Sequence, residues 1–420
     1  MKLTFPYVFK PKKQQKEILE EIMWHCAKVY NILNYDIQQG VEKINVKNSL
    51  NIESSKIYKK YREENWHSKY LHSHTLQEVI LNQLSDRKSY LAIKEKYEKG
   101  DKTIKGKPRQ PKFKQADKMQ ITFTKYAIRV EGNILKLSIS KEMQEKFKVK
   151  SLNFLIPRKL KKLVNFSSIK MIKIRKENKE KYKMEMIYEK EEKAPHGMNV
   201  MAIDLGLNNL ATCTNMNNNE TLIVAGENLK SKIGYINKEI EKLQGIQMKK
   251  EGSKKYKNTN RIKKLYKKRK NYSKTYMHKA SKMIVDYAKE NECDRIIIGD
   301  IKNIKQNMKN NKRFVQMPIQ SLVQKITYKA QLEGIEVILI KENYTSGVSS
   351  LDKEEINKEN YKKERRIERG LFKTNEGKII NADINGSLNI LRKYVKSFSP
   401  NLEIAMDIGR EQRPLKKRVA

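Results

Sequence analysis

Cysteine is scarce in this chain. Only Cys26, Cys213 and Cys293 occur among its 420 residues, and no two of them form a Cys-x-x-Cys pair. A disulfide framework and an intact zinc ribbon both need paired cysteines, so the sequence excludes both. This cysteine usage fits a reducing cytosol.

Long apolar runs and nucleotide-binding signatures are absent as well. No stretch approaches the length of a membrane-spanning helix, and the N-terminal MKLTFPYVFKPKKQQ has no apolar signal-peptide core. The G-x-x-x-x-G-K-[ST] phosphate loop and histidine pairs with metal-ligand spacing are also missing. We therefore expect a cytoplasmic protein without membrane contacts, and neither ATP hydrolysis nor a histidine metal site.

Acidic residues are few relative to basic ones. The chain has 48 Asp+Glu against 91 Lys+Arg, which gives a formal net charge of +43. A compact chain with this charge repels itself unless a polyanion neutralises it, so the composition favours a nucleic-acid partner. The cations are spread along the whole chain rather than along one helix, which argues against a basic amphipathic membrane binder. The length suggests two to three domains.

Short β-type segments dominate two parts of the N-terminal half. Residues 3–9 alternate between apolar and polar side chains, which is typical of a half-buried strand, and similar segments recur over residues 119–188. We predict that residues 1–12 and 115–195 together form a small barrel-like β module.

The segment between these parts is predicted to be helical. Apolar side chains recur at three to four residues from Ile18 to Leu33, and a capping box at Thr75 and Glu78 is typical of a helix start. Residues 13–114 are therefore expected to form a helical lobe inserted into the β module. Its last part, DKTIKGKPRQPKFKQ, carries the cations Lys105, Lys107, Arg109, Lys112 and Lys114. Gly and Pro keep this part a loop, which either contacts phosphates or is a solvated linker.

A second domain is predicted to begin near residue 196, after the charged linker KEEKAPHGMN. It contains three β-type segments (NVMAIDLG, LATCT and TLIVAG), two long cationic helical segments, and the short apolar runs DRIIIGD and IEVILIKE separated by a helix. This order of elements is that of the ribonuclease H-like fold, although many α/β domains share it. The chain is thus expected to be a mixed α/β and β multidomain protein.

Two aspartates occupy positions suited to chemistry. Asp204 ends the first predicted strand of the second domain, and Asp383 lies at the start of a helix in NADINGSLNILRKY. Strand ends and loops build the sites of α/β sheets, so these carboxylates are candidates for holding the metal ions that cleave a phosphodiester. The alternative makes Asp204 a turn former and Asp383 a helix cap.

Three segments carry a resemblance to a known family: MAIDLGLNNLAT, KPRQPKFK, and the stretch from YTSGVSS to NADINGSLNILRK. The chain resembles TnpB, a prokaryotic transposon-associated RNA-guided DNA endonuclease that is similar to the type V CRISPR nucleases. The resemblance implies that the N-terminal half is a wedge module with a recognition lobe and that residues 196–394 form a RuvC nuclease domain. It also implies that Asp204 and Asp383 are the first and third catalytic carboxylates, and that two Mg²⁺ ions serve as cofactors.

The family's zinc ribbon is degenerate here. The positions that match its four cysteines by spacing are Ser349, Asp352, Thr374 and Gly377, so we expect no zinc in the insert of about residues 345–380. The hairpin is then predicted to be held by packing of Leu351, Leu371, Phe372 and Ile379. Three arginines of this insert are candidates for nucleic-acid contacts: Arg365, Arg366 and Arg369.

The middle carboxylate of the family also departs from its pattern. The usual Ile-Glu-Asp-Leu strand end is Ile-Gly-Asp-Ile here, so Gly299 takes the place of the glutamate. Asp300 is shifted by one residue and is therefore expected to point to the other face. If the sheet has the usual order, Glu342 ends the neighbouring strand and can reach across the space that Gly299 leaves. We predict Asp204, Glu342 and Asp383 as the catalytic and metal-binding set, with Asp300 as the alternative to Glu342.

The predicted cationic helices interleave tyrosines with lysines and arginines. Tyr256, Tyr266, Tyr272 and Tyr276 lie among many cations, an arrangement that suits stacking on unpaired bases beside phosphates. The alternative is a solvated helix pair. The polar segment KNIKQNMKNNKRF is predicted to be a lid, and residues 395–420 a basic tail.

The predicted function is Mg²⁺-dependent, RNA-guided cleavage of double-stranded DNA, accessory to an insertion sequence, with one protein per guide RNA. There are two alternative hypotheses: a nuclease-deficient RNA-guided DNA binder that acts as a repressor, and a DDE-type transposase that needs no RNA. A structural RNA-binding protein is the non-enzymatic alternative, in which Asp204 and Asp383 would be replaceable.

Overall fold

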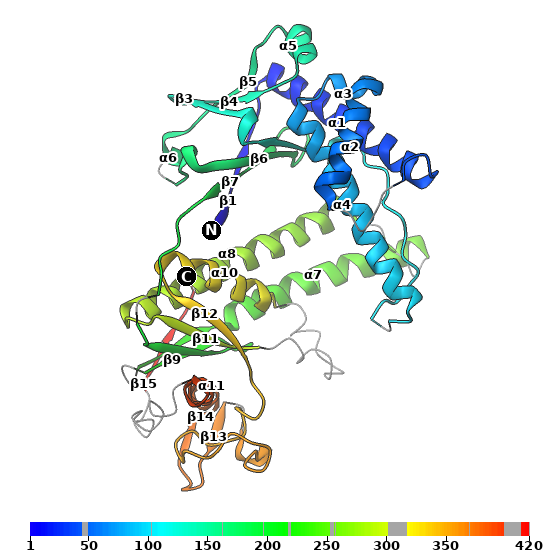
Figure 1. Cartoon of the computed structure of the whole chain (residues 1–420). Helices are drawn as coiled ribbons and strands as arrows, with labels where there is room; N and C mark the ends of the chain where they lie inside the picture. Colours follow the sequence, from blue (N-terminus) through cyan, green and yellow to red (C-terminus); the bar gives the residue numbers. More distant parts are fainter. Residues whose placement is uncertain are drawn as a thin grey trace. The chain divides into compact units, whose positions relative to one another are not determined.

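The computed structural model describes all of the chain except residues 44–48, 102, 162, 196, 217–219, 253–255, 257, 301–316, 369, 399–412 and 420. The chain divides into an N-terminal unit, Met1–Lys190, and a C-terminal unit, Glu191–Ala420 (Figure 1). None of the helices in the described part is long and apolar enough to cross a membrane.

Two antiparallel sheets form the β part of the N-terminal unit, with the strand orders β1-β7-β6-β2 and β3-β4-β5. The strands are β1 (Lys2–Phe9), β2 (Gln120–Thr124), β3 (Ile128–Glu131), β4 (Ile134–Ser138), β5 (Ser151–Leu155), β6 (Ile169–Lys176) and β7 (Tyr182–Glu189). The first strand therefore shares a sheet with segments more than 100 residues away, as expected. The expected barrel is wrong, because closure needs a ladder between edge strands and β1 and β2 remain open edges of the first sheet.

Helices lie between β1 and β2 in the sequence: α1 (Lys13–Gln38), α2 (Leu50–Glu64), α3 (Trp66–Lys69) and α4 (Ser73–Glu98); the short α5 (Lys141–Phe147) and α6 (Arg158–Lys161) come later. The apolar stripe of α1 is buried as predicted, with Ile18, Cys26 and Leu33 in the core. The predicted capping box at Thr75 is wrong, because α4 already begins at Ser73. The Thr75 hydroxyl instead donates to the Thr122 carbonyl of β2 at 3.0 Å, which ties the helical lobe to the sheet.

The C-terminal unit contains, in its described residues, a six-stranded sheet of order β12-β11-β8-β9-β10-β15. Its strands are β8 (Val200–Asp204), β9 (Asn209–Asn215), β10 (Glu220–Ala225), β11 (Arg295–Asp300), β12 (Glu336–Lys341) and β15 (Arg413–Lys417). Strand β9 is antiparallel to β8 and β10, and the other pairs are parallel. Strands β11 and β12 are neighbours, which is the arrangement on which the argument for Glu342 depends.

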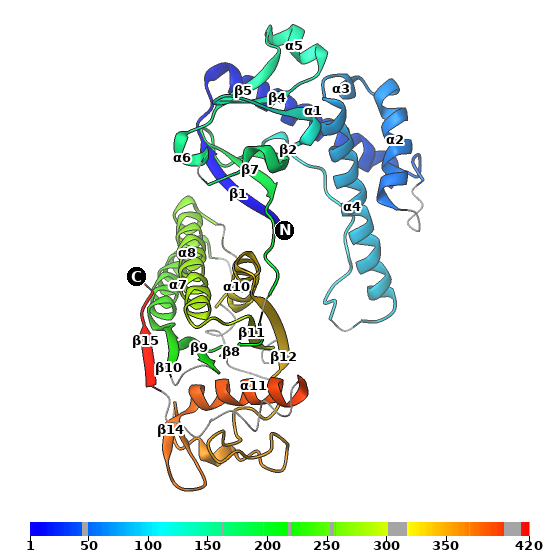
Figure 2. The same cartoon turned by 60° about the vertical axis from the view of Figure 1, so that its left-hand side comes forward.

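Helices cover both faces of this sheet. The helices α7 (Glu227–Glu251), α8 (Asn260–Glu290) and α10 (Ile319–Glu333) lie on one face, and α11 (Ala382–Phe398) lies on the other (Figure 2). Alternate strand side chains face the two layers, as the period of a strand requires. In β11, for example, Ile298 packs in the cluster of α8 and α10, whereas Ile297 packs with Ile390 and Leu391 of α11.

The C-terminal segment departs from the predicted basic tail. Helix α11 continues to Phe398 because Val395, which is 2% exposed, is still part of its apolar face. Residues 413–417 then form β15, which pairs with β10 in parallel. The outer edge of β10 presents backbone N–H and C=O groups that can bond to another strand. This pairing makes residues 413–417 a strand, although their sequence does not alternate between apolar and polar side chains.

Candidate active site

Three carboxylates emerge on the α11 face of the sheet. Asp204 is the last residue of β8, Glu342 directly follows β12, and Asp383 is the second residue of α11. Ala202 and Ile340 lie two residues before the first two carboxylates, and both belong to the α11 cluster. Since strand side chains alternate, Asp204 and Glu342 point to that same face. The structure therefore brings together the three predicted catalytic residues from segments far apart in the sequence.

Gly299 makes room for the side chain of Glu342. A Cβ atom at Gly299 would lie 1.6 Å from Glu342 Oε1 and 2.4 Å from its Cγ, so any larger residue would collide with the glutamate. Asp300 follows Ile296 and Ile298, which pack with α8 and α10, so the alternation directs its side chain to the opposite face. Glu342 thus fills the place that a glutamate at position 299 would occupy.

The electrostatics of the site favour a bound cation. Burial raises the pKa of Asp204 well above its usual range, and the charges of Glu342 and Asp383 raise it further, while Arg366 opposes them. Burial, followed by the charge of Asp300, raises the pKa of Glu342 to about 7. The Glu342 Oε1 atom is buried without a hydrogen-bond partner. Desolvated carboxylates that repel one another are stabilised by a positive ion placed among them.

A polar residue of β9 holds one of the carboxylates, and a glycine of α11 makes room for another. Asn209 Nδ2 donates to Asp383 Oδ2 at 2.8 Å. A Cβ atom at Gly386 would lie 2.7 Å from Asp204 Oδ2, so α11 approaches Asp204 closely only because this residue is glycine. Sequence reasoning missed both Asn209 and Gly386. The spacing of Gly386 three residues after Asp383, on one face of the helix, is the signal that could have found the latter.

Helix α11 also fixes the loop that carries Glu342. Its Asn385 and Asn389 side chains donate to the Val348 carbonyl at 2.8 and 2.7 Å, and Asn389 also donates to the Thr345 carbonyl at 2.9 Å. The Thr345 hydroxyl in turn donates to the Glu342 carbonyl at 2.9 Å. The same helix therefore positions Asp383 directly and Glu342 through its backbone.

A polar network occupies the degenerate ribbon, and we call Asp352, Glu354, Arg365 and Asn375 the ribbon clamp. Arg365 Nη2 donates to Glu354 Oε1 at 2.8 Å, and its Nη1 pairs with Oε2. Asn375 donates through its side chain to Glu354 Oε1 at 2.6 Å and through its backbone to Asp352 Oδ2 at 2.7 Å. The clamp thus joins the two loops that would carry cysteine pairs in a zinc ribbon.

Side-chain packing in this hairpin, β13 (Leu371–Lys373) and β14 (Ile379–Asn381), is weaker than predicted. Phe372 is fully buried, but Leu371 and Ile379 are 37% and 58% exposed. The prediction that packing holds the hairpin is therefore wrong for these two residues. Ionic and hydrogen-bonding side chains take over because the apolar surface is too small.

The structure separates the predicted nucleic-acid contacts into exposed and engaged residues. In the basic loop, Lys105, Lys107, Arg109 and Lys112 are exposed. Lys114 is not free, because it pairs with Asp86 at 2.8 Å and lies over the Tyr30 ring. Arg365 is likewise engaged, because its guanidinium pairs with Glu354 in the ribbon clamp. Arg366 is exposed, and Arg369 lies outside the described residues.

The tyrosines in and beside the cationic helices also differ in how exposed they are. Tyr256 is 42% exposed, whereas Tyr276 is buried and donates its hydroxyl to the Ala225 carbonyl at 2.6 Å. Tyr266 and Tyr272 are half-buried in the packing of α7 and α8 and of the sheet. The predicted lid KNIKQNMKNNKRF, residues 302–314, lies outside the described residues.

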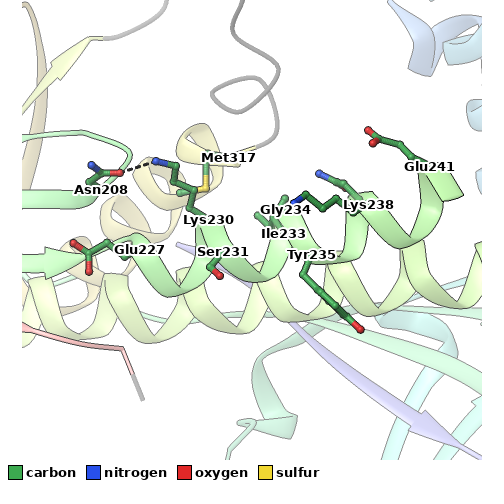
Figure 3. A pocket seen from close by; sticks show the side chains of 11 residues that line it. Asn208, Glu227, Lys230, Ser231, Ile233, Gly234, Tyr235, Lys238, Glu241 and Met317 are labelled. Atoms are coloured by element: carbon green, nitrogen blue, oxygen red, sulfur yellow. Dashed lines mark hydrogen bonds between the residues drawn. The ribbon is translucent and has the colours of Figure 1, made fainter.

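A groove of about 600 Å³ runs along α7. Lys230 and Lys238 line it two helical turns apart, with Glu227 and Glu241 beyond them (Figure 3). Lys230 Nζ donates to Asn208 Oδ1 at 2.8 Å, and Asn208 precedes the residue that holds Asp383. The groove thus carries two lysines between two glutamates and is linked through Lys230 to the loop that supports the site.

The donor set at this site suits Mg²⁺ more than zinc. Within the described residues, no three His, Cys, Asp or Glu side chains form a ready-made cage around one ion. Mg²⁺ is ordinarily held by one or two carboxylates, with waters and substrate phosphates completing its shell. The unpartnered Glu342 oxygen and the mutually repelling carboxylates fit ions of this kind.

Two protein-family profiles match the parts of the chain that carry the site residues. A family profile described as "Probable transposase" matches residues 181–305, and one described as "Cas12f1-like, TNB domain" matches residues 320–390. The first contains Asp204 and Gly299, and the second contains Glu342 and Asp383. Among curated proteins, none matches the chain.

Solved structures match over most of the chain. A Cas12f1 in complex with single-guide RNA and target DNA is 18% identical, with a TM-score of 0.63, over 90% of this chain and 83% of that one. The mini-RNA-guided endonuclease Cas_phi3 is 10% identical, with a TM-score of 0.47, over 93% and 92%. The Cas12f1 match establishes a shared fold. Together with the family profiles, it confirms the resemblance to TnpB and its type V relatives.

Proposed function

We propose that this chain is an RNA-guided DNA endonuclease of the TnpB type, accessory to an insertion sequence, and that its C-terminal unit is a RuvC domain of the ribonuclease H-like fold. The observation that carries the proposal is the gathering of Asp204, Glu342 and Asp383 on one face of the sheet beside α11. Carboxylates from strand ends and a helix start that share one half-buried site are suited to metal-dependent phosphodiester hydrolysis.

The three carboxylates would hold two Mg²⁺ ions, which supply activation of a water molecule and stabilisation of the leaving oxygen. The chain's own residues keep the carboxylates in position. Asn209 fixes the side chain of Asp383, and Gly386 lets α11 approach Asp204. Glu342 reaches the site across Gly299 without needing a carboxylate from β11.

The proposed partners are a guide RNA and a double-stranded DNA target, with one protein per guide RNA. Two features support a polyanionic partner: the net charge of +43 and the exposed cations of the basic loop. Arg366 is exposed and close enough to lower the pKa of Asp204. We place it against the phosphate of the strand being cut, where its charge would offset that of the carboxylates.

A transposase remains the rival enzyme, because one family profile carries that description. Both activities can use acidic side chains and Mg²⁺, but only the guided nuclease needs RNA. The test is to purify the full chain, identify any RNA that accompanies it, and assay DNA whose sequence matches or does not match that RNA. We expect cleavage of matched DNA only, and loss of cleavage after ribonuclease treatment. Specific cutting by an RNA-free preparation would contradict the proposal.

A nuclease-deficient binder is distinguished by the same assay. Gly299 is the feature that favours this reading, because a family carboxylate is missing there. Guided DNA binding without any cleavage in Mg²⁺ would support it and would mean that Glu342 does not replace the missing glutamate.

A further inference from the structure

The only two tryptophans of the chain meet on the surface of the N-terminal unit. Trp24 belongs to α1 and Trp66 begins α3, and their ring centroids lie 6.5 Å apart at an interplanar angle of 80°. The two residues are 38% and 53% exposed. Tryptophan is highly buried on average, so two adjacent exposed indoles indicate a surface that another molecule covers.

A layer of rings behind the indoles holds them in place. The His25 ring, which is fully buried, stacks on Tyr70 with a centroid distance of 4.5 Å, and its Nδ1 lies 3.1 Å from His67 Nδ1. Trp24 contacts the His67 ring at 5.0 Å, and Trp66 contacts the Tyr70 ring at 4.9 Å. The indoles are therefore fixed before any ligand arrives, which lowers the entropic cost of binding.

Two lysines lie beside the pair. Lys28 Nζ lies 5.5 Å from the centroid of the Trp24 ring, and the exposed Lys69 closes the short helix that Trp66 opens. Glu21, which approaches His25 at 3.3 Å, is neutralised by Lys146 at 2.7 Å. The surface thus combines rigid aromatic rings with cations.

We propose that Trp24 and Trp66 form a stacking platform for an unpaired base of the guide RNA, with Lys28 and Lys69 beside its phosphates. The proposal rests on the proposed function only in taking RNA as the partner. Aromatic platforms flanked by cations are the means by which proteins bind single-stranded nucleic acid, and RNA offers its unpaired bases in loops and ends. A second copy of this chain fits less well, because two surfaces of a chain with charge +43 repel each other.

Intrinsic fluorescence tests the platform directly, because its two indoles are the only ones in the chain. The full chain, freed of nucleic acid at high salt, is titrated with single-stranded oligouridylate and, separately, with an RNA duplex of equal charge. We expect the single strand to quench the tryptophan emission strongly and the duplex to leave most of it. Unchanged emission at saturating single-stranded RNA would overturn the proposal.

Substitution supplies the second arm. Trp66→Ala is expected to weaken binding of the oligouridylate by about 5- to 100-fold, since stacking on one base has about that effect. Trp66→Phe keeps a ring and should retain most of the affinity, which separates stacking from a folding defect. Tyr35→Ala is the matched control, because Tyr35 is an aromatic of α1 with 54% exposure outside the cluster, and it should bind normally. Equal affinity of Trp66→Ala and the wild-type chain would refute the platform.

Further outcomes identify other occupants. Quenching by single-stranded DNA but not by RNA would assign the surface to a DNA strand. An emission change on concentrating the chain alone would assign it to a second copy. Either result would overturn the proposal. Guided cleavage is measured in the same preparations. If the chain uses its RNA while the indoles stay unaffected, this inference fails and the proposed function stands. If no RNA binds at all, both fail.

Discussion

At the scale of single residues, the site depends on a carboxylate that is supplied from the end of β12 instead of from the neighbouring strand β11. The sequence has glycine where a glutamate is expected and a glutamate at the end of the next apolar run. The alternation of strand side chains, together with the sheet order that the resemblance implies, led to the prediction that Glu342, and not Asp300, shares a face with Asp204. Asn209 could not be predicted in this way, because its contact with Asp383 depends on how α11 docks against β9.

The space at Gly299 leads to the first prediction. Gly299→Ala places a Cβ atom 1.6 Å from the present position of Glu342 Oε1, so the glutamate must leave the site. We expect cleavage to fall by at least about 100-fold, the range found when one group of a preorganised site is lost, while guided DNA binding persists. Single-turnover cleavage and a filter-binding assay measure the two effects.

The matched rescue is the double variant Gly299→Glu/Glu342→Ala. It moves the carboxylate to the neighbouring strand on the same face, and we expect it to cut faster than Gly299→Ala. A double variant as inactive as Glu342→Ala alone would show that the two positions are not equivalent.

At the scale of elements, the ribbon clamp does without metal what cysteine pairs do with zinc. The loss of the cysteines was evident from the sequence, but the replacement was not, because Glu354, Arg365 and Asn375 have no spacing that marks them as partners. For the same reason, the sequence did not reveal β15, which forms by pairing with the open edge of β10. It also did not reveal that the predicted barrel stays open. Local periodicity predicts strands and helices, whereas the pairing of edges depends on the whole fold.

Because the ribbon clamp depends on an ionised Glu354, we expect the ribbon to lose stability in acid. Burial opposes ionisation of Glu354, but hydrogen bonds from Arg365, the Ser349 amide and Asn375 outweigh it and lower the pKa of this carboxyl to about 2. A depressed pKa in the folded state contributes stability above the unfolded value of about 4.3, and this contribution is lost as the pH falls from there towards 2. The protection factors of the amides in residues 349–378, that is, their hydrogen exchange relative to the intrinsic rate at each pH, should therefore fall below about pH 4.3.

Glu354→Gln should remove this acid dependence and lower the free energy of unfolding of the C-terminal unit by about 3 kcal/mol, because Arg365 is left without its counter-ion. Glu355→Gln is the control, since its pair with Lys396 is 63% and 59% exposed and such pairs contribute little. At constant Mg²⁺ concentration, neither a zinc-selective chelator nor added zinc should change the thermal unfolding of the wild-type chain. Loss of stability on chelation would mean that a metal, and not the clamp, holds the ribbon.

At the scale of the whole molecule, the charge of +43 sets how binding responds to salt. Each phosphate contact on a single strand steepens the fall of log K with log salt by about 0.7. Lys105→Ala/Lys107→Ala should therefore reduce the slope for guide RNA by about 1.4, measured as affinity at several salt concentrations. Lys114→Ala should instead destabilise the N-terminal unit, because this lysine pairs with Asp86 and covers Tyr30. An unchanged slope in the double variant would make the basic loop a linker only.

The most direct test of the account is cleavage of guide-matched DNA in Mg²⁺ by four single variants. We predict that Asp204→Ala, Glu342→Ala and Asp383→Ala abolish cutting and keep guided binding, whereas Asp300→Ala cuts at a rate within a few-fold of wild type. Active Glu342→Ala together with inactive Asp300→Ala would contradict it.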